Sequence, residues 1–165
     1  MNIVIENTSK RKCKEIVEKY HAYMDKAQHN ASVDHEIFLK ENGEKKSVGI
    51  IQYGYLACSS PIAGVKPENT ISLSRIALSN NKKNLATASM SKSIGKMKHE
   101  YARDKGIKLL VSYSRTDFEG TIYKAYGFEK DGISKGKKSI GTNMVGNKPK
   151  KDIYTKDKIR WIFWL

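Results

Sequence analysis

The fold of this chain is decided by residues 70–128, TISLSRIALSNNKKNLATASMSKSIGKMKHEYARDKGIKLLVSYSRTDFEGTIYKAYGF. The β-branched run at 70–79 predicts a strand, and the polar turn NNKKN leads from it into a long helix over residues 85–105. The apolar run at 107–114 predicts a second strand in the middle of a sheet, and a short helix closed by Gly127 follows. This order suits a site where two parallel strands meet a helix N-terminus, which can hold a phosphate-bearing cofactor.

Weaker signals on either side complete an α/β domain. Ile3–Ile5 predict a first strand, and Ser9 is the expected N-cap of a helix with apolar residues at helical spacing. The pair Asn42-Gly43 lies between two apolar runs and predicts a β-hairpin. The aromatic ending at 159–165 predicts a buried last strand. We therefore expect one domain over residues 1–165, with a central mixed sheet flanked by helices.

The composition indicates a cytoplasmic protein. Cys13 and Cys58 lie far apart and have no metal-ligand or Cys-x-x-Cys spacing, so we expect two reduced thiols. The N-terminus carries only a short apolar run, and no stretch of about 18 apolar residues occurs anywhere in the chain. We therefore expect neither a signal peptide nor a membrane span.

The net charge of +14 indicates a polyanionic partner, with nucleic acid the first candidate. Ten basic residues stand against three acids between Lys130 and Arg160. Part of this stretch, residues 132–151, is rich in Gly, Ser, Lys and Asn, and we expect a mobile basic loop or an irregular hairpin there. The alternative is a solvated, lysine-rich face without a partner. The lysines expected to contact DNA are Lys135, Lys137, Lys138, Lys148, Lys150 and Lys151.

In this order, the motifs resemble the GNAT acetyltransferase fold, and within it the phage DNA-modification proteins of the Mom type. The resemblance rests on SLSRIAL, LATASMSKSIGKM, LLVSYS and GTIYKAYGF, with Tyr20-His21 and the hairpin upstream, and covers roughly residues 15–165. It implies a single GNAT-like domain and a transferase that adds a carbamoylmethyl group to adenine N6 in DNA, which protects that DNA from restriction. Because N6 is paired in a duplex, the base would have to be flipped out. Tyr53, Tyr55 and Tyr126 are candidates for stacking on it, although each also fits ordinary packing.

The segment before the long helix departs from the acetyltransferase pattern. Acetyltransferases carry a glycine-containing loop here that holds the pyrophosphate of coenzyme A, whereas residues 80–86 contain no glycine. This absence favours the Mom-type branch over an ordinary acetyltransferase. The resemblance still implies acetyl-CoA or a related CoA thioester as donor. Its phosphates would lie near the helix N-terminus, at Lys82, Lys83, Asn84 and Ala86.

Candidate catalytic residues come from the resemblance and from strand ends. In the GNAT pattern, a tyrosine at the position of Tyr123 lies near the thioester sulfur and protonates the departing thiolate, and a phenol is protonated at neutral pH. Arg75 is a charged residue in an otherwise apolar strand, so it needs a partner or lines a cleft. Ser112 and Asp117 follow the second strand, where ligand groups gather in α/β sheets, although Asp117 also fits a helix cap. His21 is a further acid/base candidate, and each of these residues also has a purely structural interpretation.

A metal ion such as iron is possible only if ligands from distant segments converge, because no close His, Asp or Glu cluster occurs in the sequence. Three functions stay open at this point. The first is the DNA-modifying transferase. The second is a conventional acetyl-CoA-dependent N-acetyltransferase that acts on a protein, a small amine or aminoacyl-tRNA. The third is a non-catalytic nucleic-acid-binding protein built on the same scaffold.

Overall fold

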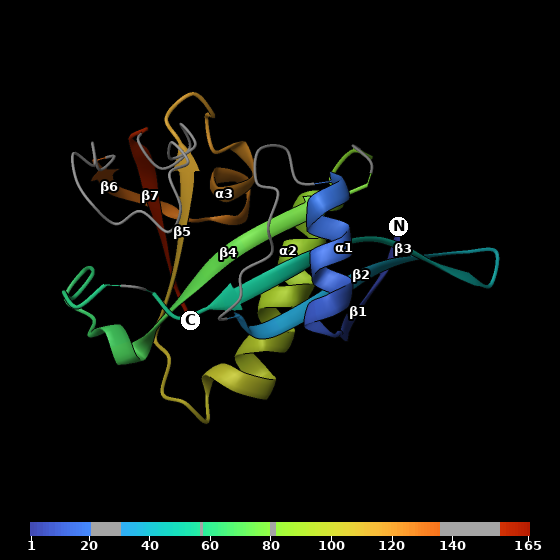
Figure 1. Ribbon diagram of the computed structural model, residues 1–165, viewed down its shortest axis with the longest axis horizontal. Helices are drawn as coiled ribbons and strands as arrows, with labels where there is room; N and C mark the ends of the chain where they lie inside the picture. The colour runs from blue at the N-terminus through green and yellow to red at the C-terminus, as the bar shows by residue number, and fades with distance from the viewer. Residues whose placement is uncertain (21–30, 57, 80–81, 136–155) are drawn as a thin grey trace, which may run out of the picture.

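The computed structural model describes residues 1–20, 31–56, 58–79, 82–135 and 156–165. Within these residues, a seven-stranded mixed sheet has the order β1-β2-β3-β4-β5-β7-β6 (Figure 1). Neighbouring strands are antiparallel except for β4 and β5, which are parallel. The strands are β1 (Asn2–Asn7), β2 (Ala31–Glu41), β3 (Glu44–Gly54), β4 (Thr70–Leu78), β5 (Leu109–Arg115), β6 (Glu129–Ser134) and β7 (Lys158–Trp164).

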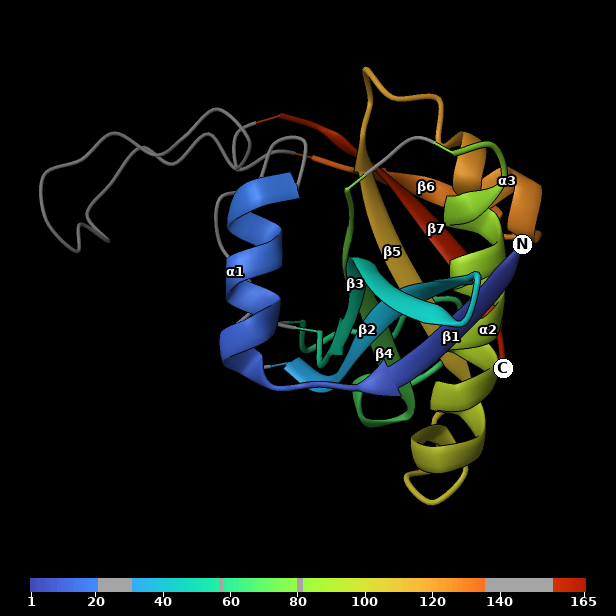
Figure 2. The same cartoon turned by 90° about the vertical axis from the view of Figure 1, so that its right-hand side faces the viewer.

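Helices cover both faces of this sheet. Figure 2 shows α1 on one side, with α2 and α3 on the other. The larger core cluster lies under α2 and α3, and a smaller one lies under α1. No described helix is long and apolar enough to cross a membrane. The helices are α1 (Lys10–Tyr20), α2 (Leu85–Met97) and α3 (Thr121–Tyr126), with a 3-10 turn at Pro67–Asn69 and a π-helical turn at Lys98–Ala102.

The local signals in the N-terminal half form the expected elements. The Lys12 N–H donates to Ser9 Oγ over 3.3 Å, so Ser9 caps α1. Asn42 and Gly43 both have positive φ, of 51° and 84°, which is the backbone of a type I′ hairpin turn. Cys13 and Cys58 are both free thiols. The expected first strand, capped helix and hairpin are confirmed.

A bulge in β4 separates β4 from β5. Leu73 is paired with Tyr53 of β3, while Arg75 is paired with the preceding residue Gln52, so Ser74 is an extra residue in β4. The Ser74 hydroxyl donates to the Gln52 carbonyl over 3.0 Å. Pairing between β4 and β5 ends at Leu73 and Ser112, although both strands continue. Beyond these residues the two strands move apart, as Figure 1 shows, and we call the region between their diverging ends the notch.

The C-terminal part differs in detail from the prediction. The expected last strand is β7, which lies between β5 and β6 in the sheet. The chain from Gly132 to Ser134 is the end of β6, so the expected loop cannot begin at Gly132. Residues 136–155 of that stretch lie outside the described residues.

Candidate active site

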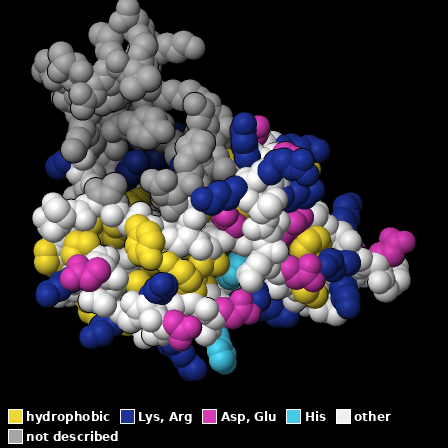
Figure 3. Space-filling view, turned by 60° about the horizontal axis from the view of Figure 1, so that its bottom comes forward, with side chains coloured by type: hydrophobic (Ala, Val, Ile, Leu, Met, Phe, Trp, Pro, Cys, Tyr) yellow, Lys and Arg dark blue, Asp and Glu magenta, His cyan; other side chains and the backbone are white. Residues whose placement is uncertain are grey.

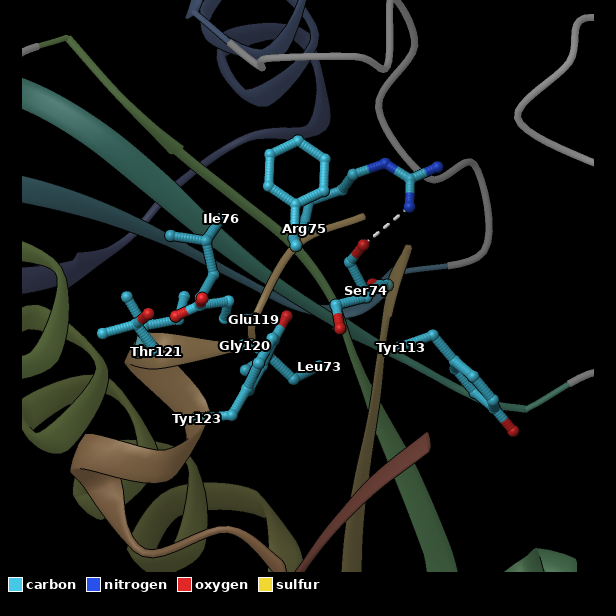
Figure 4. A pocket seen from close by; sticks show the side chains of 12 residues that line it. Leu73, Ser74, Arg75, Ile76, Tyr113, Glu119, Gly120, Thr121 and Tyr123 are labelled. Atoms are coloured by element: carbon cyan, nitrogen blue, oxygen red, sulfur yellow. Dashed lines mark hydrogen bonds between the residues drawn. The ribbon is translucent and has the colours of Figure 1, made fainter. Parts of the chain in front are cut away.

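The notch between β4 and β5 opens into a cavity of about 310 Å³, a volume typical of small-molecule sites (Figure 4). Its walls come from β4 beyond the bulge, the end of β5, the following loop and the start of α3. The lining residues are Leu73, Ser74, Arg75, Ile76, Tyr113, Ser114, Phe118, Glu119, Gly120, Thr121, Ile122 and Tyr123.

Two hydroxyl groups meet at the apex of the notch. Ser112 Oγ lies 2.8 Å from the Leu73 carbonyl oxygen and 3.0 Å from the Tyr123 phenol oxygen. A hydroxyl has one proton and a carbonyl can only accept. The Ser112 hydroxyl can therefore donate its proton to one of two acceptors within reach, the Leu73 carbonyl oxygen or the phenol oxygen of Tyr123. This arrangement connects the phenol to the last paired residues of the parallel strands.

Aromatic packing holds the Tyr123 ring in this position. The ring stacks on Trp161 of β7 with centroids 5.6 Å apart and lies edge-on to Phe128 at 5.5 Å. The Trp161 indole N–H donates to Ser114 Oγ over 2.9 Å, which fixes the indole in turn. Gly120, at the N-cap of α3 with φ 66°, has its Cα beside the indole. The phenol therefore has little freedom to leave the apex.

Arg75 lies on the other face of the sheet from Tyr123. It is paired with Gln52, and Ala77 two residues later packs under α1. Its guanidinium donates to the Ser74 carbonyl over 2.6 Å, and Figure 4 shows the side chain extending away from Tyr123. The structure thus places Arg75 at the cavity but does not bring its charge to the phenol.

The Asp117 carboxylate forms an ion pair with Arg115 and does not cap α3. Arg115 Nε donates to Asp117 Oδ1 over 2.8 Å, and this hydrogen bond, with the Arg115 charge, lowers the pKa of Asp117. Gly120, not Asp117, occupies the N-cap position of α3, so the alternative of a helix cap is wrong. Asp117 is exposed beside the cavity and is not one of its lining residues. His21 lies outside the described residues.

The four residues predicted to hold a donor phosphate lie at the start of α2. Lys82 donates to Glu41 over 2.8 Å, Lys83 is exposed, and Ala86 is in the first helical turn. Asn84 is the N-cap, with φ 63°, and its side chain forms no capping hydrogen bond. The N–H groups of the first turn are therefore not capped by Asn84. This geometry fits an anion at the end of the helix, and the paired Lys82 would have to exchange Glu41 for it.

The predicted stacking tyrosines do not line the cavity. Tyr53 is fully buried and hydrogen-bonded to Ser93 over 2.7 Å, so its predicted stacking role is wrong. Tyr55 is exposed, but its hydroxyl lies 2.6 Å from that of Tyr101 on α2's π-helical extension. Tyr126 packs on Phe163 and the rings around it.

Among the lining residues that the sequence analysis does not single out, Phe118 and Glu119 have side chains suited to binding or proton transfer. Phe118 is 44% exposed, and Glu119 is the only carboxylate among the lining residues. Both follow the second strand in the segment TDFEG, where only Asp117 was considered. An aromatic residue and an acid next to that aspartate were the available signal.

On the face that Figure 3 shows, the described Lys and Arg side chains are interspersed with Asp and Glu side chains. Lys135 is exposed and forms an ion pair with Asp157 over 3.0 Å. Among the described residues, no group of three or more His, Cys, Asp or Glu side chains is arranged to hold a metal ion. The other predicted DNA contacts, Lys137, Lys138, Lys148, Lys150 and Lys151, lie outside the described residues.

Comparisons with known proteins agree with this architecture. The model of the Mom protein family matches residues 2–160. No curated protein sequence matches the chain. The ribosomal-protein-S18-alanine N-acetyltransferase of Escherichia coli is 14% identical, with a TM-score of 0.59 over 99% of this chain and 94% of that one. An acetyltransferase of Bacillus subtilis in complex with CoA is 12% identical, with a TM-score of 0.61 over 99% and 98%. An N-acetyltransferase of Staphylococcus aureus is 18% identical, with a TM-score of 0.59 over 99% of each chain. At these identities, the structural likeness shows that the chain has the GNAT fold.

Proposed function

Because the chain belongs to the Mom protein family and has the GNAT fold, we propose that it is a transferase that modifies adenine N6 in DNA. The transferred group is of the carbamoylmethyl type, and its donor is a CoA thioester or a related activated compound. The observation that carries the proposal is the Ser112–Tyr123 hydroxyl pair at the apex of the notch, beside a cavity open to ligands. Such DNA would resist restriction, as a phage or prophage requires.

The notch has features that fit a CoA-type donor. Beyond Leu73, the edge of β4 that faces β5 has no strand partner among the described residues, so its backbone groups can pair with the amides of an extended ligand. The N-terminus of α2 offers N–H groups to phosphates. Attack of the adenine amine on the carbonyl carbon of a bound thioester would break the C–S bond, release a thiol and give an N6-acyl group. A carbamoylmethyl group, in which N6 is bonded to a CH2 carbon, would instead require an activated donor with its leaving group on that carbon.

The residues of the chain supply the proton transfers. The Tyr123 phenol carries a proton at the apex, where its oxygen is within reach of a hydrogen bond from Ser112. Donation of the phenol proton into the cavity would place it on the leaving group. The attacking amine loses a proton as its new bond forms, and Glu119 is the carboxylate in the cavity wall that can accept it.

The three functions open at the sequence level are separated by nucleoside mass spectrometry of DNA from cells that express the protein. A new modified adenosine, absent from cells with an empty vector, is the expected result. The same DNA should resist restriction endonucleases whose sites contain adenine. Unmodified DNA with retained DNA binding would favour the non-catalytic alternative. Turnover of acetyl-CoA on small amines, protein or aminoacyl-tRNA, with unmodified DNA, would favour the conventional acetyltransferase.

A further inference from the structure

The notch is bounded by residues from both faces of the sheet. Tyr123 approaches it from the α3 side. Arg75 and Tyr113 also line the cavity, but their strand partners, Gln52 and Arg160, place them on the α1 side. The cavity therefore extends to the α1 side of the sheet, away from the phenol. We call the part lined by Arg75 and Tyr113 the α1-side mouth. Donor and acceptor can thus approach from different faces.

Basic side chains from three strands lie on this α1 side of the sheet, and one of them, Arg75, lines the cavity. Arg115 of β5 is paired directly with Lys158 of β7, and both lie on the same face as Tyr113. Burial, and then the nearby positive charge of Arg75, lowers the pKa of Lys158. Arg75 and Lys158 lie on the same face of the sheet, on either side of β5. An anion bound between these two partly buried cations would offset their repulsion.

An exposed aromatic ring stands at the same mouth. Phe118 lines the cavity and is 44% exposed. The Arg115 guanidinium lies 5.5 Å from its ring centroid and is held by the Asp117 carboxylate. A phosphate alone would not require the ring, and an apolar ligand would not require the cations. An aromatic platform beside cations is the combination that binds a nucleotide within a single strand.

We propose that the α1-side mouth binds one nucleotide of a DNA strand, with its base against Phe118 and its phosphates on Arg75 and Lys158. This inference rests on the proposed function in one respect, since it takes DNA as the acceptor. A base inserted from this side would carry its exocyclic amine toward Glu119 and the apex of the notch. Arg75 is then a substrate-binding residue rather than a partner of Tyr123.

The test uses the full-length protein and a short single-stranded oligodeoxynucleotide that contains one 2-aminopurine. Replacing Phe118 with Leu should weaken binding by about 5- to 150-fold and remove the change in 2-aminopurine fluorescence on binding. Lys158→Gln should reduce the slope of log K against log salt by about 0.7, which corresponds to one lost phosphate contact. Trp164→Leu and Lys108→Gln are matched controls, because both residues are exposed and lie near the closed end of the notch. They should bind as the wild type does.

Equal losses of oligonucleotide affinity in the test variants and the control variants would overturn the inference. A second result would also overturn the inference: Phe118→Leu and Lys158→Gln bind the oligonucleotide as the wild type does, while cells expressing the wild type contain modified adenosine. The proposed transferase reaction would then still hold. Specific losses of binding in these two variants, with no modified adenosine in any sample, would support the nucleotide site and refute the proposed reaction.

Discussion

At the scale of single residues, Gly120 is the position where the cavity wall tolerates least change. Its φ of 66° disfavours any side chain, and a Cβ there would overlap the Trp161 indole. Gly120→Ala should therefore destabilise the protein by about 2–4 kcal/mol, from backbone strain and overpacking together. Chemical denaturation measures this change.

Gly95 is the matched control for that substitution. It lies on the exposed side of α2, and a Cβ there would meet nothing within 4 Å. Gly95→Ala should stabilise the protein by up to about 1 kcal/mol, because alanine favours a helix more than glycine does. The two Gly→Ala substitutions should thus change the free energy of unfolding in opposite directions. A Gly120→Ala protein as stable as the wild type would mean that Trp161 is not packed against α3.

Removing the Tyr123 hydroxyl should leave the fold intact. Tyr123→Phe keeps the ring on Trp161, and Ser112 keeps its hydrogen bond to the Leu73 carbonyl. Because the buried Ser112 hydroxyl does not lose its last partner, the loss of stability should stay below about 1.5 kcal/mol. Thermal unfolding checks this, and a larger loss would indicate that the phenol serves the fold.

The sequence predicts part of the candidate site and misses part of it. Ser112 is predicted from its place at a strand end and Tyr123 from the resemblance to the GNAT pattern, and the two hydroxyl groups lie 3.0 Å apart. Simple alternation along β4 would put Arg75 on the face of Leu73, but the bulge at Ser74 moves it to the other face. No local pattern in SLSRI marks that bulge, because it depends on pairing with β3.

At the scale of elements, the candidate site lies where β4 and β5 move apart, beyond their last paired residues Leu73 and Ser112. The sequence predicts both strands, the mid-sheet position of the second one and the helices that follow them, because long apolar runs and helical periodicity are local signals. The placing of β7 between β5 and β6 is not local and could not be predicted in the same way. Trp161, which stacks on Tyr123, is brought to the notch by that insertion.

The contact between β2 and α2 makes stability depend on pH. His35 of β2 is 1% exposed, and its Nδ1 lies 2.8 Å from Ser93 Oγ on α2. Burial, and then the charge of Lys96, lowers the pKa of His35 from 6.5 to about 4. Between these two pH values, the unfolded chain takes up a proton that the folded protein does not. Stability should therefore be complete above pH 6.5 and fall by about 3 kcal/mol as the pH drops to 4.

Urea unfolding at a series of pH values measures this dependence. His35→Gln should flatten the part of the curve between pH 4 and 6.5. His99 is exposed, so His99→Gln is the control and should keep the wild-type curve. An identical pH dependence in His35→Gln and the wild type would show that other groups are responsible.

At the scale of the whole molecule, the charge of +14 predicts salt-sensitive DNA binding with little preference for sequence. If about five or six phosphates are contacted, log K should fall with log salt at a slope of about −5. A titration at several salt concentrations measures the slope, and an affinity independent of salt would refute the prediction.

Replacing the lysines between residues 135 and 138 with Gln should flatten this salt dependence more than replacing the three basic residues at the start of α1. The two variants to compare are Lys135/Lys137/Lys138→Gln and Lys10/Arg11/Lys12→Gln.

We propose that a group is transferred to adenine in the β4–β5 notch. The fraction of modified adenosine in cellular DNA tests this proposal most directly. Mass spectrometry should compare DNA from cells that express the wild type, Tyr123→Phe or Tyr126→Phe at equal levels. Tyr126 lies on the same helix outside the cavity lining, so its variant controls for loss of a hydroxyl. We predict modification by the wild type and Tyr126→Phe, and a rate lower by roughly 10²–10⁴-fold in Tyr123→Phe. Modification by Tyr123→Phe at the wild-type rate would contradict the account.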